Sequence, residues 1–157
     1  MVFVGINPSL TSATVRHHFA RPGNRFWPVL HRAGFTPRQL RPDEDRLLLD
    51  FGVGVTNLVD RATRSASELQ PREYEEGARR LARKMRRIRP EVVAVVGVDA
   101  FRRGFGQKAA AVGRQEITIG GRPTWVLPNP SGLNAHYQMP DLIHLYRALH
   151  AHLSWDR

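Results

Sequence analysis

The 157-residue sequence predicts an α/β fold, a three-layer sandwich in which helices cover both faces of a short, mostly parallel central sheet. Three observations favour this class. Four short segments of strand character alternate with longer segments of helical periodicity. Residues 91–97 (EVVAVVG) are apolar on both faces, as a central parallel strand is. The length suits one domain, over residues 1–157, with a single sizeable core.

The elements follow from apolar, β-branched runs for the strands and from apolar stripes at helical spacing for the helices. The last strand is expected to pair with residues 116–119 through a tight turn at Gly120 and Gly121. The predicted strands span 2–6, 53–58, 91–97 and 124–127, and the predicted helices span about 25–34, 43–51, 71–89, 99–105 and 140–153.

The most basic stretch of the chain is residues 79–89 (RRLARKMRRIR), at the end of the helix that leads into the third strand. Leu81, Met85 and Ile88 are spaced for one buried helical face, which places the charges outside. Since the helix ends where the strand begins, these arginines are expected at the edge of the sheet opposite the strands' carboxyl ends. A solvated surface is the simplest interpretation.

Composition narrows the range of functions. The net charge of +10 favours polyanionic partners, nucleic acid first. The absence of cysteine excludes disulfides, cysteine nucleophiles and thiolate metal sites. No apolar run approaches the roughly 20 residues that cross a membrane and no secretory leader is evident, which predicts a cytoplasmic protein without membrane contact. Neither histidine spacing nor glycine motifs indicate a bound group, so no metal and no cofactor are expected.

Two loops are expected to share one edge of the sheet. In an open parallel sheet, ligands bind beyond the carboxyl ends of the strands. GINPS (5–9) follows the first strand, and LPNPSGLNAHY (127–137) follows the fourth. Together these loops therefore form one candidate site.

Asn7 in the first loop and Leu133 in the second each have two interpretations. The amide of Asn7 can donate and accept hydrogen bonds and so hold a water, or it can form an Asx turn ahead of Pro8. Ser131 and neighbouring backbone N–H groups can hold phosphate oxygens. Leu133 is expected to be exposed, either as an ordinary surface leucine or as a wedge between base pairs.

The sequence resembles a known family at these loops. GINP (5–8), FARPGNRFW (19–27), GVTNLVDRAT (54–63) and LPNPSGL (127–133) are similar to the mismatch-specific uracil-DNA glycosylases, the bacterial relatives of thymine-DNA glycosylase. The resemblance implies a uracil-DNA glycosylase-like fold and hydrolysis of the N-glycosidic bond of uracil in double-stranded DNA, best in G·U mismatches. It further implies activity on ethenocytosine, weaker activity on thymine, and no cofactor. A monomer is expected.

The resemblance also implies roles for single residues. Asn7 matches the residue that positions the attacking water, Phe19 the residue that stacks on the flipped base, and Leu133 the residue inserted into the base stack. Ser9 stands where more selective uracil glycosylases carry a tyrosine that excludes thymine, which implies a looser pocket. Gly132 and its neighbours match backbone that contacts the remaining guanine. The candidates for base binding are Ile6, Ser9, Ser12, Phe19 and Asn129.

Two departures from the family pattern stand out. After Leu133, family members read Ser-Arg where this chain reads Asn134-Ala135, so Asn134 or His136 is expected to replace the arginine contact. The histidine pair at 17–18 also differs from the usual lead-in to the stacking aromatic.

Charged residues near the same edge complete the candidate site. Arg16, Arg21 and Arg25 are expected to contact phosphates, with Ser131 and the rest of the second loop. Asp60 either pairs with a neighbouring arginine or helps to activate water, and is a secondary catalytic candidate. Asp99 is expected to be a helix N-cap. Neither loop contains a lysine, which predicts a monofunctional glycosylase without Schiff-base chemistry. A non-enzymatic basic nucleic-acid-binding module and another nucleotide hydrolase are the alternatives.

Overall fold

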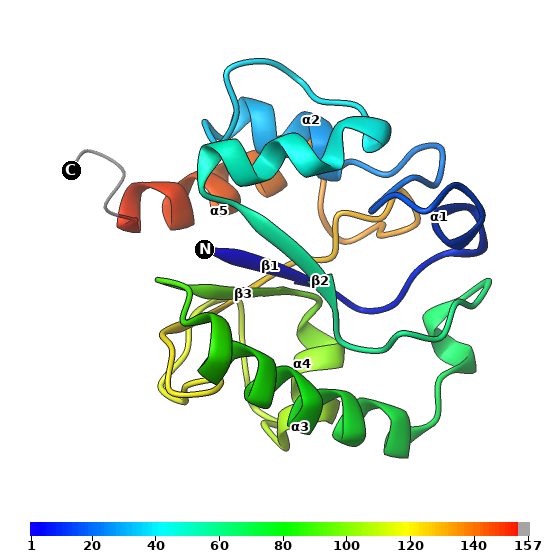
Figure 1. Ribbon diagram of the computed structural model, residues 1–157, viewed down its shortest axis with the longest axis vertical. Helices are drawn as coiled ribbons and strands as arrows, with labels where there is room; N and C mark the ends of the chain where they lie inside the picture. The colour runs from blue at the N-terminus through cyan, green and yellow to red at the C-terminus, as the bar shows by residue number, and fades with distance from the viewer. Residues whose placement is uncertain (154–157) are drawn as a thin grey trace.

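The computed structural model describes residues 1–153 and places a five-stranded sheet between two helical layers (Figure 1). The strand order is β2-β1-β3-β5-β4, and only the edge strand β4 runs antiparallel. The predicted fold class is therefore confirmed. The domain expected over 1–157 includes residues 154–157, which lie outside the described residues. The strands are β1 (Val2–Gly5), β2 (Gly54–Asn57), β3 (Val93–Val96), β4 (Gly113–Arg114) and β5 (Thr124–Leu127).

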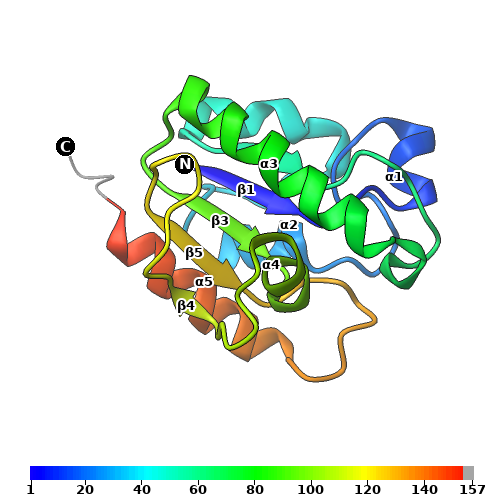
Figure 2. The ribbon, with the colours of Figure 1, turned by 90° about the horizontal axis from the view of Figure 1, so that it is seen from below.

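The two faces of the sheet are covered by different helices (Figures 1 and 2). Alternation along β1 sends Phe3 into one core and Val4 into the other. The first core packs against α2 (Phe26–Arg32), α5 (Met139–His152) and the 3₁₀ helix η1 (Pro42–Phe51). The second packs against α3 (Pro71–Ile88) and α4 (Val98–Phe105). Within residues 1–153, no helix is long and apolar enough to span a bilayer.

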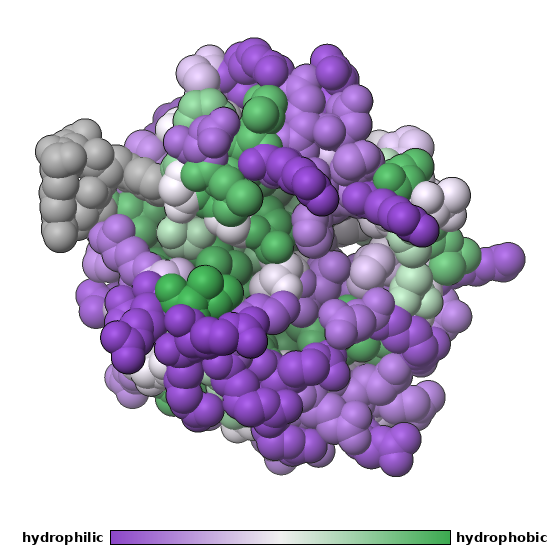
Figure 3. Space-filling model, viewed as in Figure 1, coloured by the Kyte–Doolittle hydropathy of each residue, from purple (hydrophilic) through white to green (hydrophobic). Residues whose placement is uncertain are grey.

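The basic helix α3 differs from its predicted pattern at one position. Leu81 and Met85 are buried as expected, but Ile88 is 53% exposed because α3 ends there, at a left-handed Arg89. The outer surface along α3 is hydrophilic (Figure 3).

The predicted hairpin partner of β5 is wrong. Gly120 and Gly121 do form a tight turn with positive φ angles of 59° and 78°. However, the ladder with β5 is made by β4, and the Gln115 N–H donates to the Thr124 carbonyl oxygen at 2.9 Å. Of the predicted residues 116–119, only Ile119 pairs across the turn, with Arg122. The Thr124 hydroxyl reinforces this pair by accepting from the Ile119 N–H at 3.0 Å and donating to the Arg122 carbonyl oxygen at 3.0 Å.

Two short helices near the sheet's carboxyl edge were not expected from the sequence: α1 (Leu10–Val15) and the 3₁₀ turn η2 (Ala66–Glu68). Both begin at a serine cap. Ser9 Oγ accepts from the Ser12 N–H, and Ser65 forms a capping box with Glu68. These helices lie in the loops that follow β1 and β2, where they build the walls of the candidate site.

Candidate active site

The loops after β1 and β5 border one cavity of about 580 Å³, within the size range of small-molecule sites. Asn7, Phe19 and Leu133 all line it, so the structure brings together the three side chains on which the sequence-based site depends. Residues of the segments 16–24 and 63–66 complete the walls. Of the predicted site residues, the cavity is lined by Ile6, Asn7, Ser9, Ser12, Arg16, Phe19, Arg21, Asn129, Ser131, Leu133 and Asn134.

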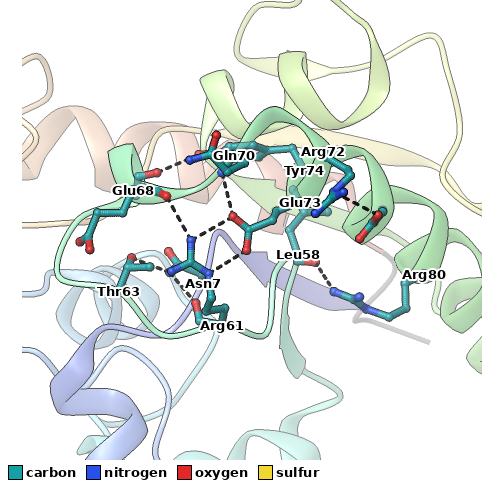
Figure 4. A network of polar contacts seen from close by, with 12 residues as sticks. Asn7, Leu58, Arg61, Thr63, Glu68, Gln70, Arg72, Glu73, Tyr74 and Arg80 are labelled. Carbon is teal, nitrogen blue, oxygen red and sulfur yellow. Dashed lines mark hydrogen bonds and ion pairs between the residues drawn. The ribbon is translucent and has the colours of Figure 1, made fainter.

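The side chain of Asn7 is held in one orientation (Figure 4). Its Nδ2 donates to the Arg61 carbonyl oxygen and to Thr63 Oγ1, both at 2.8 Å. The carbonyl oxygen accepts only, so the atom that faces it must be the nitrogen, which fixes the amide against a flip. Among the described residues Oδ1 makes no hydrogen bond, and it is left to accept one from a molecule in the cavity.

The partners of Asn7 are themselves anchored. Thr63 is buried, and its N–H donates to the Pro8 carbonyl oxygen at 3.2 Å. The Arg61 guanidinium bonds both carboxylate oxygens of Glu73, at 2.8 and 3.0 Å, and the Glu68 carbonyl oxygen at 3.1 Å (Figure 4). The hydrogen bond from Arg61, followed by the one from the Gln70 N–H, lowers the pKa of Glu73 to about 2. Neither Arg61 nor Thr63 was among the predicted site residues, although both lie in the motif GVTNLVDRAT.

Phe19 forms an aromatic wall of the cavity. Its ring stacks on Phe26 with centroids 4.0 Å apart and an interplanar angle of 22°. Its φ angle of 51° is rare for an aromatic residue, and Ser12 supports it, since Ser12 Oγ accepts from the Ala20 N–H at 3.0 Å. The site also requires Gly5, where a Cβ would lie 2.7 Å from Asn57 Oδ1 and 3.2 Å from the Phe19 ring.

The histidine pair lies in the wall next to Phe19. Asp45, on η1, accepts from the His18 N–H at 3.0 Å and lies 3.3 Å from His17 Nδ1. The His18 carbonyl oxygen accepts from Trp27 Nε1 at 3.2 Å. Burial lowers the pKa of His18 despite the opposing effect of Asp45, so the ring is neutral at physiological pH.

Arg25 has a different position from the one expected. Its guanidinium donates to the carbonyl oxygens of Tyr137 and Ser131 at 2.7 Å, of Asn134 at 3.1 Å and of Pro130 at 3.4 Å. The group is therefore occupied by the backbone of the second loop, which argues against the phosphate contact expected from the sequence. By contrast, Arg16 and Arg21 are exposed at the cavity rim.

The loop after β5 packs closely against Gly23, while its Leu133 side chain stays free. A Cβ on Gly132 would lie 2.5 Å from the Gly23 carbonyl oxygen, so this approach requires a glycine. Leu133 is 72% exposed. The loop thus has a rigid base and an unpacked apolar tip.

The polar residues of this loop mainly bond the loop itself. Asn129 Oδ1 accepts from the Ser131 N–H at 2.9 Å, and Asn134 Nδ2 donates to the Asn129 carbonyl oxygen at 3.0 Å. His136 does not line the cavity that contains Asn7. It lines a neighbouring cavity of about 910 Å³ together with Asp99 and Arg102. Of the two residues expected to replace the family arginine, only Asn134 lines both cavities.

Neither aspartate is placed for catalysis. The Asp60 side chain is 81% exposed, lies outside the cavity lining and is 3.8 Å from Arg80 rather than beside its sequence neighbours. The expectation that Asp60 helps to activate water is therefore not supported. Asp99 lies within the first turn of α4, bonded to Arg103 at 2.8 Å, and the predicted N-cap role falls instead to Gly97.

Residues 1–153 contain no group of three or more histidines and carboxylates arranged to hold a metal ion. The side chains that line the cavity carry amide, hydroxyl and aromatic groups together with arginine and histidine side chains. The family model of the uracil DNA glycosylase superfamily matches residues 1–151 of the chain.

Proposed function

The chain belongs to the uracil DNA glycosylase superfamily, whose members are DNA glycosylases of base excision repair, and from that premise we propose its substrate and mechanism. The protein removes uracil from double-stranded DNA by hydrolysis, prefers G·U mismatches, and acts as a monomer without a cofactor. The single observation that carries the proposal is the shared cavity, which places the fixed amide of Asn7 and the free side chain of Leu133 on one rim.

Base extrusion is the first step. A base inside a duplex cannot be attacked at its sugar, so the nucleotide must leave the stack, at a cost of a few kcal/mol that is smaller at a mismatch. Leu133 is exposed and sits on a rigid loop, so it can fill the gap that the base leaves. Arg16 and Arg21 at the rim contact the phosphates and supply affinity that does not depend on sequence.

Hydrolysis follows in the cavity. Phe19 stacks on the extruded uracil, and backbone groups near Ile6 and Phe19 bond its polar edge. Asn7 Oδ1 accepts from a water, whose oxygen bonds to C1′ as the bond from C1′ to uracil N1 breaks. The electron pair leaves with uracil, and the proton that the water loses neutralises the uracil anion. Because uracil is a tolerable anion, fixed dipoles suffice and no carboxylate base is required.

The breadth of the pocket follows from Ser9. Its small side chain caps α1 and leaves space where a tyrosine would exclude a methyl group. Ethenocytosine is therefore a further substrate and thymine a weaker one. Schiff-base chemistry is disfavoured because neither Lys84, bonded to Thr56, nor Lys108 lines the cavity.

The test is release of free base from duplexes that carry G·U, A·U, G·T or ethenocytosine opposite guanine, compared with single-stranded uracil DNA. We expect the fastest release from G·U and strand cleavage only after alkali. Tight DNA binding without base release would instead favour a non-enzymatic binding module, and activity confined to free nucleotides would favour another hydrolase.

A further inference from the structure

The most basic stretch of the chain lies along α3, away from the cavity, and the proposed mechanism does not use it. Residues 79–89 carry seven basic residues and no acidic one, in a chain of net charge +10. Two of the seven point toward the sheet and have partners there, since Arg80 bonds the Leu58 carbonyl oxygen and Lys84 bonds Thr56 Oγ1. The other five are exposed, and we call them the α3 arginine face: Arg79, Arg83, Arg86, Arg87 and Arg89.

The charges of the α3 arginine face are not paired within the described residues 1–153. None of its five side chains takes part in a hydrogen bond or an ion pair there. Arg79 and Arg83, and again Arg83 and Arg87, are four residues apart, a spacing at which like charges repel on a helix. The helix dipole accounts for Arg86 and Arg87 in the last turn but not for the two arginines before it.

The geometry suits the backbone of a nucleic acid duplex. Helical spacing puts Arg79, Arg83, Arg86 and Arg87 within an arc of about 100°, opposite the buried face, and spreads them over about 12 Å. The same length of duplex axis carries about seven phosphate charges. Arginine also bonds phosphate in a bidentate way that lysine does not.

The α3 arginine face and the cavity lie toward opposite edges of the sheet. Glu73, at the start of α3, bonds Arg61 beneath Asn7, whereas α3 ends beside the first residues of β3. Figure 3 shows the outer surface over α3 as a hydrophilic band. We propose that this surface binds the phosphate backbone of a second DNA duplex while the cavity edge holds the first, so that one monomer bridges two duplex segments.

The test uses bridging between duplexes and needs no glycosylase activity. One undamaged duplex is immobilised on beads, a second is labelled in solution, and its capture through the protein is measured. The matched variants are Arg83→Gln/Arg87→Gln on α3 and Arg32→Gln/Arg46→Gln, which removes the same charge from exposed sites elsewhere. We expect capture by the wild type and the control pair, and at least a tenfold loss in the α3 pair. The salt dependence of binding to one duplex should also become shallower by about 0.9 for each lost phosphate contact.

Retained capture in the α3 pair, absent capture in the wild type, or tighter binding of double-stranded RNA or polyglutamate at this surface would each overturn the proposal. Single-turnover release of uracil by the α3 pair at saturating enzyme should match the wild type. A wild type that bridges duplexes yet releases no base would contradict the glycosylase function alone, which separates the two proposals.

Discussion

The loops after β1 and β5 hold their functional side chains in opposite ways. In the first loop the side chain itself is fixed, since both amide hydrogens of Asn7 are bonded to a segment more than fifty residues away. In the second loop Arg25 holds the backbone, whereas the side chain of Leu133 is exposed and unpacked. The difference fits the two proposed tasks: a water would be held at one point, whereas a wedge would enter a gap that exists only in the complex with DNA.

The first prediction concerns Asn7, the fixed side chain of the loop after β1. Asn7→Ala removes the acceptor proposed to orient the water and should lower single-turnover base release by on the order of 10²-fold or more, because small misplacements of a nucleophile are costly. Asp60→Asn is the matched control at the same edge and should stay within about twofold. Quenched-flow measurement with G·U duplex checks both. An Asn7→Ala rate within a few-fold of wild type would contradict the assigned role.

The second prediction concerns Arg25, which holds the backbone of the loop after β5. Arg25→Lys keeps the charge but loses the planar fork that bonds the loop carbonyls, so duplex activity should fall about tenfold or more while release from single strands falls less. The free energy of unfolding should fall by about 1–3 kcal/mol. Kinetics on both substrates and urea unfolding are the measurements. Full activity of the lysine variant on duplex DNA would instead support a simple phosphate contact.

The third prediction tests whether the Thr63 hydroxyl holds the amide of Asn7 in place. Thr63→Val removes one of the two acceptors for Asn7 Nδ2 and leaves the Arg61 carbonyl oxygen, so the rate should fall by about five- to tenfold, less than for Asn7→Ala. Thr63→Ser restores the hydroxyl and should recover most of the rate. If the valine and serine variants have equal rates, the hydroxyl does not position Asn7.

The fourth and smallest effect concerns the wall beside Phe19. Burial lowers the pKa of His18 in the folded state, so the unfolded chain takes up the proton first as the pH falls. Stability should be insensitive to this group above about pH 7.5 and should decrease as the pH falls through about 6.5. Thermal unfolding across this range should show a flatter profile for His18→Gln, and an unchanged profile would contradict the burial of the ring.

The sequence predicted the parts of the molecule that depend on local pattern. Apolar runs placed the parallel strands, and the rule for the carboxyl edge of a sheet placed Asn7 and Leu133 together. It failed where hydrogen bonds outside the apolar pattern decide the outcome. Ile119 bonds the Thr124 hydroxyl, and α1 begins at the Ser9 cap and is tied by Ser12 to the Phe19 turn.

The candidate site shows the same division. Asn7 and Leu133 were predicted from their residue types and their loops, and Phe19 from the family resemblance. Thr63 anchors Asn7 from 56 positions away, and Arg25 anchors the second loop from up to 112 positions away. A local sequence pattern cannot predict contacts between residues so far apart. An exposed arginine and an anchoring arginine look alike in a sequence, which is why Arg25 was expected at phosphate.

The most direct test separates extrusion from hydrolysis. A fluorescent base analogue, 2-aminopurine, is placed next to uracil in a G·U duplex, and its unstacking is followed by stopped flow beside base release. We expect Asn7→Ala to retain the fluorescence rise but not base release, whereas Leu133→Ala should lose the rise yet still release uracil from single strands. Loss of the same step in both variants would contradict the division of work between the two loops.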